Sequence, residues 1–560
     1  MQETHKPRDA QFNRMAEITA LGIVLLPVML LRVFYINAYI EVMPYAVHPL
    51  NDARMYWDLS RAILQDGWLL PGEGPFYQAP LYPYILALLQ HLGIYQVESI
   101  IRLQSLLGVI TTLQVYLLAR FMLPIRWSTM AALLFGLGHY PLFFESKVLA
   151  STAGMALFLL FALSYVLWLK KQKTVWLVDS AVIFSLSVLC RANLIFALPF
   201  LLIHIAGPWP KSIRSKTDWR GAINKAIIFL AIFITGILPV TLRNYFVGGS
   251  LIPISANSGV TLYMGTNSQA AGGLAPVAGL SNDIAQQKTG SIALASKLAG
   301  EDFSPSEASN FWVRKTAEWI MHNPTSFIIL EGKKLLWSLY QAPPAVNYSS
   351  HFEEQWIAML QWMKWFTAIT VLVGLAGLPL LLINCNRNKT FLLSLLGGYV
   401  LLCLVFYASD RFLCSTLPFL AISGAYGMKR LVQLIYGKRK YFALHKTTLF
   451  LFMLWIIICA GFVFNPTLNF NKENEIGMGW YNLGAYYEGR DNPVEALQAY
   501  ENALDYLPEF PSLLLNLGVL YGRNNDLERS TELFKRVLQI DPANQKAQDN
   551  LRINLNRQYR

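Results

Sequence analysis

Long apolar stretches alternate with short polar segments along most of the chain. A transmembrane helix needs about 20 consecutive apolar residues, and about eleven stretches approach this length. They lie at residues 18–40, 99–122, 127–144, 148–169, 174–190, 192–206, 223–246, 362–384, 390–408, 412–435 and 447–465. The pattern predicts an all-α, polytopic membrane domain over residues 1–470. The first stretch has no small-residue cleavage site, so we expect it to stay as an anchor.

The composition agrees with this pattern. Of the 560 residues, 54% are hydrophobic and only 14% are charged, which excludes an ordinary soluble protein. The formal net charge of +12 could indicate a nucleic-acid partner, but the basic residues gather in short loops between apolar stretches. These loops are residues 120–126, 170–173, 207–222, 385–389 and 428–446. They follow the positive-inside rule, and we expect no nucleic-acid partner.

The same charge bias sets the expected topology. If the basic loops are cytoplasmic, the N-terminus is cytoplasmic, and the loops 41–98 and 248–361 and the C-terminal tail lie outside. We expect a multi-pass protein of a bacterial inner membrane whose long loops face the periplasm. Residues 70–98, which contain Pro80 and Pro83, are too interrupted for a span and predict a re-entrant or interfacial helix. Loops as long as 248–361 are usually functional.

The first outer loop contains an amphipathic helix over residues 51–65. At 100° per residue, Asp52, Tyr56, Leu59 and Ile63 share one face, which would lie inward along the membrane surface. The opposite face carries Arg54, Asp58, Arg61 and Gln65. Either Asn51 or Asp52 could cap the helix, and Gly67 could end it. Asp52 is therefore either a capping residue or a functional carboxylate placed at the membrane surface.

The C-terminal tail carries the clearest motif of the chain. A pattern of aromatic, small and proline residues recurs after about 34 residues, the period of a tetratricopeptide repeat. The first copy is Trp480, Leu483, Gly484, Tyr487, Ala496, Tyr500, Ala503 and Pro508, and the second is Leu514, Leu517, Gly518, Tyr521, Ser530, Phe534, Val537 and Pro542. We expect a repeat domain over 471–560, with repeats 477–510 and 511–544 and a capping helix 545–556. Such a short α-solenoid could bind a protein partner, self-associate or dock on the membrane domain.

Ionisable residues at or near membrane depth are candidate functional residues. On the expected outer side they are Asp52, Arg54, Glu145, Lys147, Arg191, Arg243, Lys333, Lys334 and Arg411. Cations outnumber carboxylates, the reverse of what the positive-inside rule favours on this face. An anionic ligand would explain the excess, and a phosphate at the lipid–water boundary is the anion that Arg binds bidentately. Each single Arg could equally be an interfacial anchor or half of an ion pair.

The sequence shows no motif for metal binding or for disulfide formation. The five cysteines lie in or beside apolar stretches without CxxC spacing, and the eight histidines form no HExxH or HxH pair. We expect the cysteines to be packing residues, no structural metal and no cofactor. Assistance by a divalent metal is left open.

The order of several motifs resembles the GT-C superfamily of integral-membrane glycosyltransferases, in its protein-mannosyltransferase and aminoarabinose-transferase branch. The resemblance covers roughly residues 15–436. Its motifs are Asp52 with Tyr56 four residues later, Pro80–Pro83, Phe144–Ser146, Pro239–Asn244, the Ser/Gly/Asn-rich loop 255–267, and Asp410–Phe412 followed by Pro418. One position departs from the pattern. The family often has Asp-Glu, but Asp52 is followed by Ala53, which weakens any two-acid or metal-assisted mechanism.

The resemblance implies a GT-C-like topology and a transfer reaction on the outer face. A sugar would pass from a polyprenyl-phosphate carrier in the membrane to a protein, a lipid-linked glycan or a cell-wall polymer, as a rule with inversion. Asp52 would be the general base, because a phosphate leaving group needs no general acid, unlike glycoside hydrolysis. The substrate-binding candidates are Arg54, Tyr56, Glu145, Arg243, Lys333, Lys334 and Arg411, with Arg411 and Arg243 ranked first for the departing phosphate.

Two other classes of function fit parts of the sequence. A transporter or flippase for polyprenyl-linked glycans would also bind a lipid phosphate, although no matched pair of broken helices is visible. A non-catalytic scaffold would use the membrane domain to present the repeats. Loss of turnover with retained folding on substitution of Asp52 would distinguish the enzyme from both.

Overall fold

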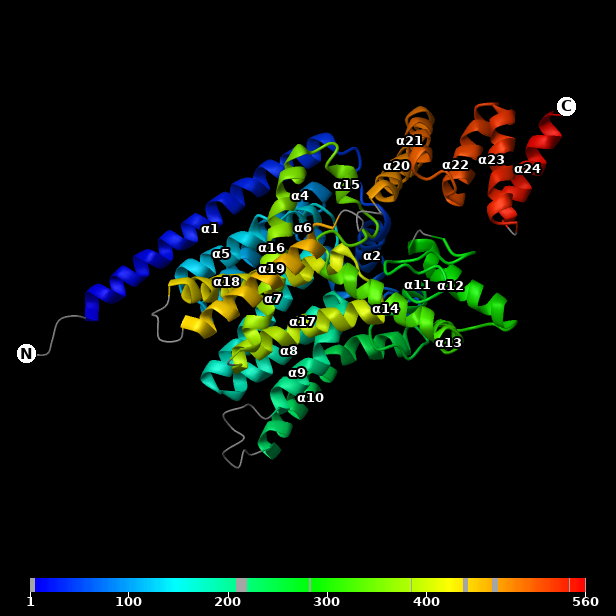
Figure 1. Cartoon of the computed structure of the whole chain (residues 1–560). Helices are drawn as coiled ribbons and strands as arrows, with labels where there is room; N and C mark the ends of the chain where they lie inside the picture. Colours follow the sequence, from blue (N-terminus) through cyan, green and yellow to red (C-terminus); the bar gives the residue numbers. More distant parts are fainter. Residues whose placement is uncertain are drawn as a thin grey trace, which may run out of the picture.

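Every regular element that the structure describes is a helix (Figure 1). The computed structural model describes residues 6–207, 219–281, 284–383, 385–436, 442–465, 472–542 and 544–558. The all-α prediction is confirmed. The basic loops expected at 207–222 and 428–446 and the domain boundary at 470 fall partly or wholly outside the described residues.

The membrane domain contains most of the long helices. They are α1 (Lys6–Val42), α4 (Val97–Arg120), α5 (Ile125–Gly136), α6 (His139–Glu145), α7 (Ala150–Lys171), α8 (Thr174–Cys190), the 3-10 helix η1 (Ala192–Ala197), α9 (Leu198–Ala206), α10 (Trp219–Phe246), α16 (Ala358–Leu382), α17 (Arg387–Val405), α18 (Asp410–Tyr436) and α19 (Phe442–Val463). Six of the described helices, α1, α4, α7, α10, α16 and α17, are long and apolar enough to cross a bilayer. The chain is a multi-pass membrane protein.

Two predicted spans are broken in the structure. The stretch 127–144 is divided because α5 ends at Gly136 and α6 begins at His139. The stretch 192–206 begins as the 3-10 helix η1 before it continues as α9. The predicted spans 174–190, 412–435 and 447–465 correspond to α8, α18 and α19. These helices are not among the six that are long and apolar enough to cross a bilayer. The interfacial segment expected at 70–98 contains only the 11-residue α3 (Leu81–His91), too short to span a bilayer.

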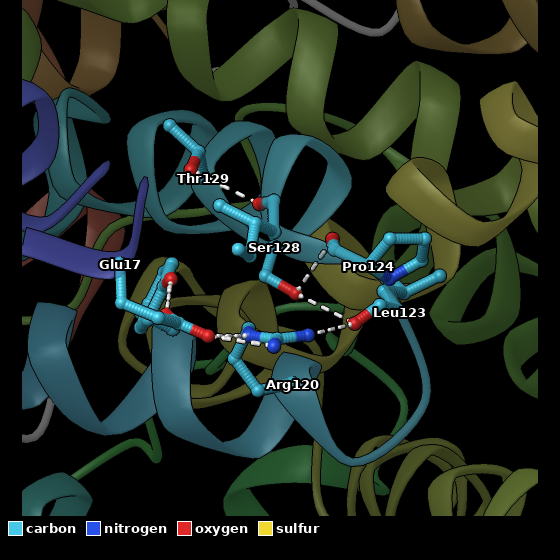
Figure 2. A network of polar contacts seen from close by, with 8 residues as sticks. Glu17, Arg120, Leu123, Pro124, Ser128 and Thr129 are labelled. Atoms are coloured by element: carbon cyan, nitrogen blue, oxygen red, sulfur yellow. Dashed lines mark hydrogen bonds and ion pairs between the residues drawn. The ribbon is translucent and has the colours of Figure 1, made fainter. Parts of the chain in front are cut away.

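A polar network joins α1, α4 and α5 far from the first outer loop (Figure 2). Arg120 at the end of α4 donates 2.9 and 2.6 Å hydrogen bonds to Glu17 of α1. Arg120 also donates a 2.7 Å bond to the carbonyl of Leu123, which accepts another from Ser128 of α5. At 1.5 Å per residue, Glu17 lies roughly 38 Å along α1 from Val42. The network therefore fixes the helix ends remote from the expected outer face.

Helices α16 and α18 approach closely at glycine positions. A Cβ atom added at Gly377 of α16 would lie 2.2 Å from the carbonyl oxygen of Ser423, and one at Gly374 would lie 2.7 Å from Leu420. The Ser423 hydroxyl donates a 2.8 Å hydrogen bond to the Gly374 carbonyl. Small residues allow this contact between membrane helices. It matters for the site because α18 begins at Asp410, beside Arg411.

The outer segments contain a second group of helices. They are α2 (Asn51–Asp66), α3, α11 (Ser258–Gly265), α12 (Ile284–Ala299), α13 (Pro305–His322), α14 (Pro324–Leu339) and α15 (Ser350–Glu353). Helices α13 and α14 meet at Pro324, which begins α14. Trp312 and Phe311 of α13 form a small core with Val260 and Met264 of α11. The two long loops therefore have their own folded structure.

Five helices form the C-terminal tail, at one end of the chain in Figure 1. They are α20 (Lys472–Glu488), α21 (Pro493–Tyr506), α22 (Pro511–Arg523), α23 (Leu527–Ile540) and α24 (Gln545–Gln558). The glycines of the repeat pattern lie at close helix contacts: Gly484 packs against the Tyr500 ring and Gly518 against the Phe534 ring. The assignment to tetratricopeptide repeats stays a prediction.

We expect Gly377→Leu to destabilise the membrane domain. The new side chain must displace the α18 backbone, and overpacking typically costs about 1–3 kcal/mol. Thermal unfolding of the purified protein in detergent would show a lower midpoint. Gly461→Leu is the matched control, because nothing lies within 4 Å of a Cβ atom there. Equal midpoints for the two variants would contradict the close contact.

Candidate functional site

The α2 helix begins in an unusual backbone conformation immediately before Asp52. Its N-cap is Leu50, in an extended conformation and without a side-chain cap hydrogen bond. Asn51 follows with a φ of +49°, a left-handed conformation in which Asn is enriched. The prediction that Asn51 or Asp52 caps this helix is therefore wrong. The carboxylate of Asp52 is directed to another partner.

That partner is Arg411, 359 residues away in sequence. The Arg411 guanidinium donates a 2.6 Å hydrogen bond from Nη1 to Oδ2 of Asp52. Asp52 is 5% exposed, and the Arg411 side chain is 16% exposed. The other guanidinium nitrogens of Arg411 make no hydrogen bond with any residue that the structure describes. A largely buried ion pair thus keeps donors available for a further anion.

Arg191, at the end of α8, holds the α18 backbone beside this pair. It donates a 2.7 Å hydrogen bond to the carbonyl oxygen of Arg411 and a 2.6 Å bond to the Ser415 hydroxyl. Two guanidinium groups therefore lie close together at the start of α18. Such a cluster favours a negatively charged ligand.

Tyr56 lies one turn after Asp52 on the buried face of α2, as predicted. Its ring packs edge-on against Tyr82 of α3, with centroids 5.3 Å apart. The Tyr82 hydroxyl donates a 2.6 Å hydrogen bond to Gln104 of α4. Gln104 in turn donates to the carbonyls of Glu145 and Lys147, at 3.0 and 2.6 Å. The Pro80–Pro83 and Phe144–Ser146 motifs are thus joined through Gln104, which the sequence analysis did not single out.

Glu145 has a cationic partner that the sequence analysis did not select. Its carboxylate accepts a 2.8 Å hydrogen bond from Arg32 of α1, and both side chains are 1% exposed. Arg32 also donates to the carbonyl of Gly136 at 3.0 Å. Arg32 lies inside the first apolar stretch, where an ionisable residue is itself a signal. The structure gives Glu145 an ion pair within the helix bundle instead of a contact with Asp52.

Arg243 has a different environment from Arg411. It donates hydrogen bonds to the carbonyls of residues 69, 70, 73 and 74 in the first outer loop. Its guanidinium also lies over the Phe76 ring, 4.2 Å from the centroid. Through these contacts Arg243 holds the turn that follows α2. The structure does not bring it to Asp52.

The other predicted cations are also separate from the pair. Lys334 is buried and donates 2.9 Å hydrogen bonds to the Thr266 hydroxyl and the Leu404 carbonyl. It also forms a 2.7 Å ion pair with Glu331. Lys333 is exposed. Arg54 is 75% exposed and lies 3.6 Å from Asp58 on the outer face of α2.

A second buried ion pair joins the turn between α6 and α7 to the second outer loop. The Lys147 ammonium donates a 2.9 Å hydrogen bond to Glu353, and both side chains are 1% exposed or less. The same ammonium lies 3.9 Å from the Tyr39 ring centroid, and Tyr45 donates to Glu353 at 3.3 Å. Burial raises the pKa of Glu353 and lowers the pKa of Lys147 to about 8, while their ion pair opposes both shifts. No sequence pattern pointed to Glu353.

No group of three or more His, Cys, Asp or Glu side chains in the described ranges is arranged to hold a metal ion. Asp52 meets a cation instead of a second carboxylate. The geometry gives this site the Asp52 carboxylate for proton transfer and cationic donors for an anion.

Part of the chain matches a known protein family. Residues 77–237 match the model of the dolichyl-phosphate-mannose-protein mannosyltransferase family. The matched region includes the Pro80–Pro83 and Phe144–Ser146 motifs and excludes Asp52 and Arg411. The match confirms the resemblance drawn from the sequence. Over these residues the chain is similar to a family of mannosyltransferases.

Two solved structures are more distantly similar. The oligosaccharyltransferase of Archaeoglobus fulgidus in the apo form has a TM-score of 0.43 and 14% identity, covering 86% of this chain and 59% of that chain. The archaeal oligosaccharyltransferase AglB from A. fulgidus, in complex with an inhibitory peptide and a dolichol-phosphate, has a TM-score of 0.41 and 15% identity, with the same coverage. The chain thus spans about 59% of the length of these proteins. These similarities are too distant to bear on the activity. The comparison with curated proteins gives no match.

We expect Lys147→Met to destabilise the protein strongly, because it leaves Glu353 buried without its cation. Breaking a buried pair from one side typically costs about 3–5 kcal/mol. Thermal unfolding in detergent would measure the loss, and adding Glu353→Gln should recover part of it. Lys315→Met, in an exposed pair with Glu318, should cost about 0–1 kcal/mol. If the two single variants unfold alike, Lys147 and Glu353 do not form a stabilising pair.

Proposed function

We propose that the protein transfers a sugar from a polyprenyl-phosphate carrier to an acceptor, with Asp52 as general base. The observation that carries this proposal is the ion pair between Asp52 and Arg411. It joins an acidic residue at the start of α2 to a cation with donors available for a phosphate. The family model supports the donor class, because its name specifies a dolichyl-phosphate sugar.

The reaction needs few protein groups. The acceptor hydroxyl attacks the anomeric carbon and gives its proton to the Asp52 carboxylate. The bond between the anomeric carbon and the phosphate oxygen breaks, and its electron pair stays on the carrier phosphate. Arg411 stabilises this growing charge through the guanidinium edge that does not bind Asp52. A single displacement inverts the anomeric configuration.

The positive-inside pattern favours the periplasmic face of a bacterial inner membrane. Support comes from the contacts among segments that this pattern assigns to the outside. Tyr348 of the second outer loop bonds the backbone of Leu50 in the first, and Asp52 of the first outer loop meets Arg411 at the start of α18. Membrane lipids would hold the carrier chain beside this surface.

The acceptor is a protein, a lipid-linked glycan or a cell-wall polymer. The folded tail beside the outer loops favours a protein acceptor. The alternatives to catalysis are a flippase for polyprenyl-linked glycans and a scaffold that presents the tail. Both need the fold, and the flippase also needs carrier binding, whereas neither needs a proton acceptor at Asp52.

We expect Asp52→Asn to lower sugar transfer by about 10²–10⁴-fold, the usual contribution of a positioned general base. The assay uses the purified full-length protein, a panel of radiolabelled polyprenyl-phosphate sugars and membranes containing the endogenous acceptors. Asp58→Asn is the matched control, because it makes the same change on the exposed face of the same helix. Full transfer by Asp52→Asn would exclude the proposed base. Carrier binding without transfer by the wild type would favour the flippase or the scaffold.

We expect Arg411→Gln to lower turnover by about 10²–10³-fold, because one transition-state donor is lost. Arg411→Lys should restore only part of the rate, since an ammonium cannot serve Asp52 and a phosphate in the planar geometry of a guanidinium. Arg61→Gln, on the exposed face of α2, is the control. Retained turnover in Arg411→Gln would show that the departing phosphate is stabilised elsewhere.

A further inference from the structure

The first helix of the C-terminal tail contacts the outer loop that lies beside the site. Glu475 of α20 accepts a 2.9 Å hydrogen bond from the backbone N–H of Ala345 and a 3.4 Å bond from the Ser349 hydroxyl. About two turns later, Asn482 donates a 2.9 Å bond to the carbonyl of Asn347. These contacts hold residues 345–349 at three points, two on the backbone and one on the Ser349 side chain.

The same five residues contact the backbone around Asp52. The Asn347 carbonyl that accepts from Asn482 also accepts a 3.4 Å hydrogen bond from the Asn51 side chain. Asn347 has a φ of +73°. A residue held in this left-handed conformation needs support from its surroundings. The chain of contacts therefore runs from Asn482 through one carbonyl oxygen to the residue before Asp52.

The loop also reaches the other half of the ion pair. The carbonyl of Pro344 accepts a 3.2 Å hydrogen bond from the backbone N–H of Asp410, the residue before Arg411. Tyr348 exchanges two hydrogen bonds with the Leu50 backbone, at 3.1 and 2.9 Å. Residues 344–348 are thus fixed to the chain immediately before both Asp52 and Arg411.

A second contact from α20 reaches the first outer loop directly. The Tyr486 ring stacks on His48, with centroids 5.6 Å apart, and Arg490 lies 2.8 Å from the Nδ1 atom of His48. Phe352 fills the space over Gly479, where an added Cβ atom would lie 2.2 Å from its ring. Helix α20 therefore supports both loops that lead into the site.

The chemistry of Glu475 distinguishes this contact from simple attachment of a domain. A carboxylate that leaves water needs hydrogen-bond donors in exchange, and Glu475 receives them from the loop backbone and Ser349. Burial raises its pKa. Without Glu475 the Ala345 N–H loses its acceptor, and an unpaired backbone group is costly where water cannot replace the partner.

We infer that Glu475 and Asn482 are positioning residues of the transfer reaction, so that helix α20 is part of the catalytic unit. This inference rests on the proposed function and adds a role for the tail. It excludes a tail that only recruits a partner. A displacement of about 1 Å can cost 10²-fold in rate, so we expect Glu475→Ala and Asn482→Ala each to lower kcat about 10–100-fold. The KM for the carrier should change less than about threefold, because Arg191 still holds the Arg411 carbonyl.

The test measures kcat and KM on the full-length protein, with the radiolabelled polyprenyl-phosphate sugar that the wild type transfers. Glu475→Gln keeps an oxygen acceptor for the Ala345 N–H and should restore most of the rate. Glu473→Ala, at an exposed position of the same helix, should behave as the wild type. Amide hydrogen exchange of residues 345–349 should speed up in Glu475→Ala and stay slow in Glu475→Gln.

The outcomes separate this inference from the proposed function. If Asp52→Asn loses transfer while Glu475→Ala and Asn482→Ala keep the wild-type kcat, the tail does not position the site. A raised KM with unchanged kcat would equally overturn the inference and assign the tail to substrate binding. If Glu475→Ala folds poorly, Asn482→Ala supplies the same test. Retained transfer in Asp52→Asn would refute the proposed base itself.

Discussion

The ion pair between Asp52 and Arg411 is the interaction on which the arrangement of the site depends. A buried charge without a partner destabilises the fold. The ion pair therefore holds the start of α2 against the start of α18, 359 residues away in sequence. The surrounding contacts fix the backbone on each side of the pair. Arg191 holds the Arg411 carbonyl, and Tyr348 holds Leu50. In the proposed reaction, a phosphate replaces part of the attraction between Arg411 and Asp52 without a large movement of the chain.

The rest of the membrane domain gives this pair a rigid support. The close contacts at Gly374 and Gly377 bring the backbones of α16 and α18 together. This packing limits how far Arg411 can move. Two other carboxylates near the site, Glu145 and Glu353, are each neutralised by a buried cation. Their charges stabilise packing between segments, whereas Arg411 keeps donors available. Glu145 and Glu353 therefore hold the fold, whereas Arg411 can contact a substrate.

Local patterns in the sequence were sufficient for the helices and for the buried face of α2. Asp52 and Tyr56 point inward and Arg54 and Asp58 outward because helical periodicity depends only on nearby residues. The partners of these residues could not be predicted in the same way. Arg243 has the residue type and position of a phosphate ligand, and only the path of residues 69–74 shows that its donors bind carbonyls. The left-handed Asn51, which turns Asp52 away from the helix N-terminus, also left no sequence signal.

The contact between Glu475 and Ala345 has a consequence for how the protein matures. A ribosome produces residues 344–349 well before it produces α20, so this loop emerges without the acceptor for its Ala345 amide. The membrane helices can insert and pack while that backbone group still bonds water. The loop gains its final partner only after the last membrane helix has been made and the tail has folded on the same side. Completion of the site is thereby tied to placement of the whole tail on the same side of the membrane as this loop.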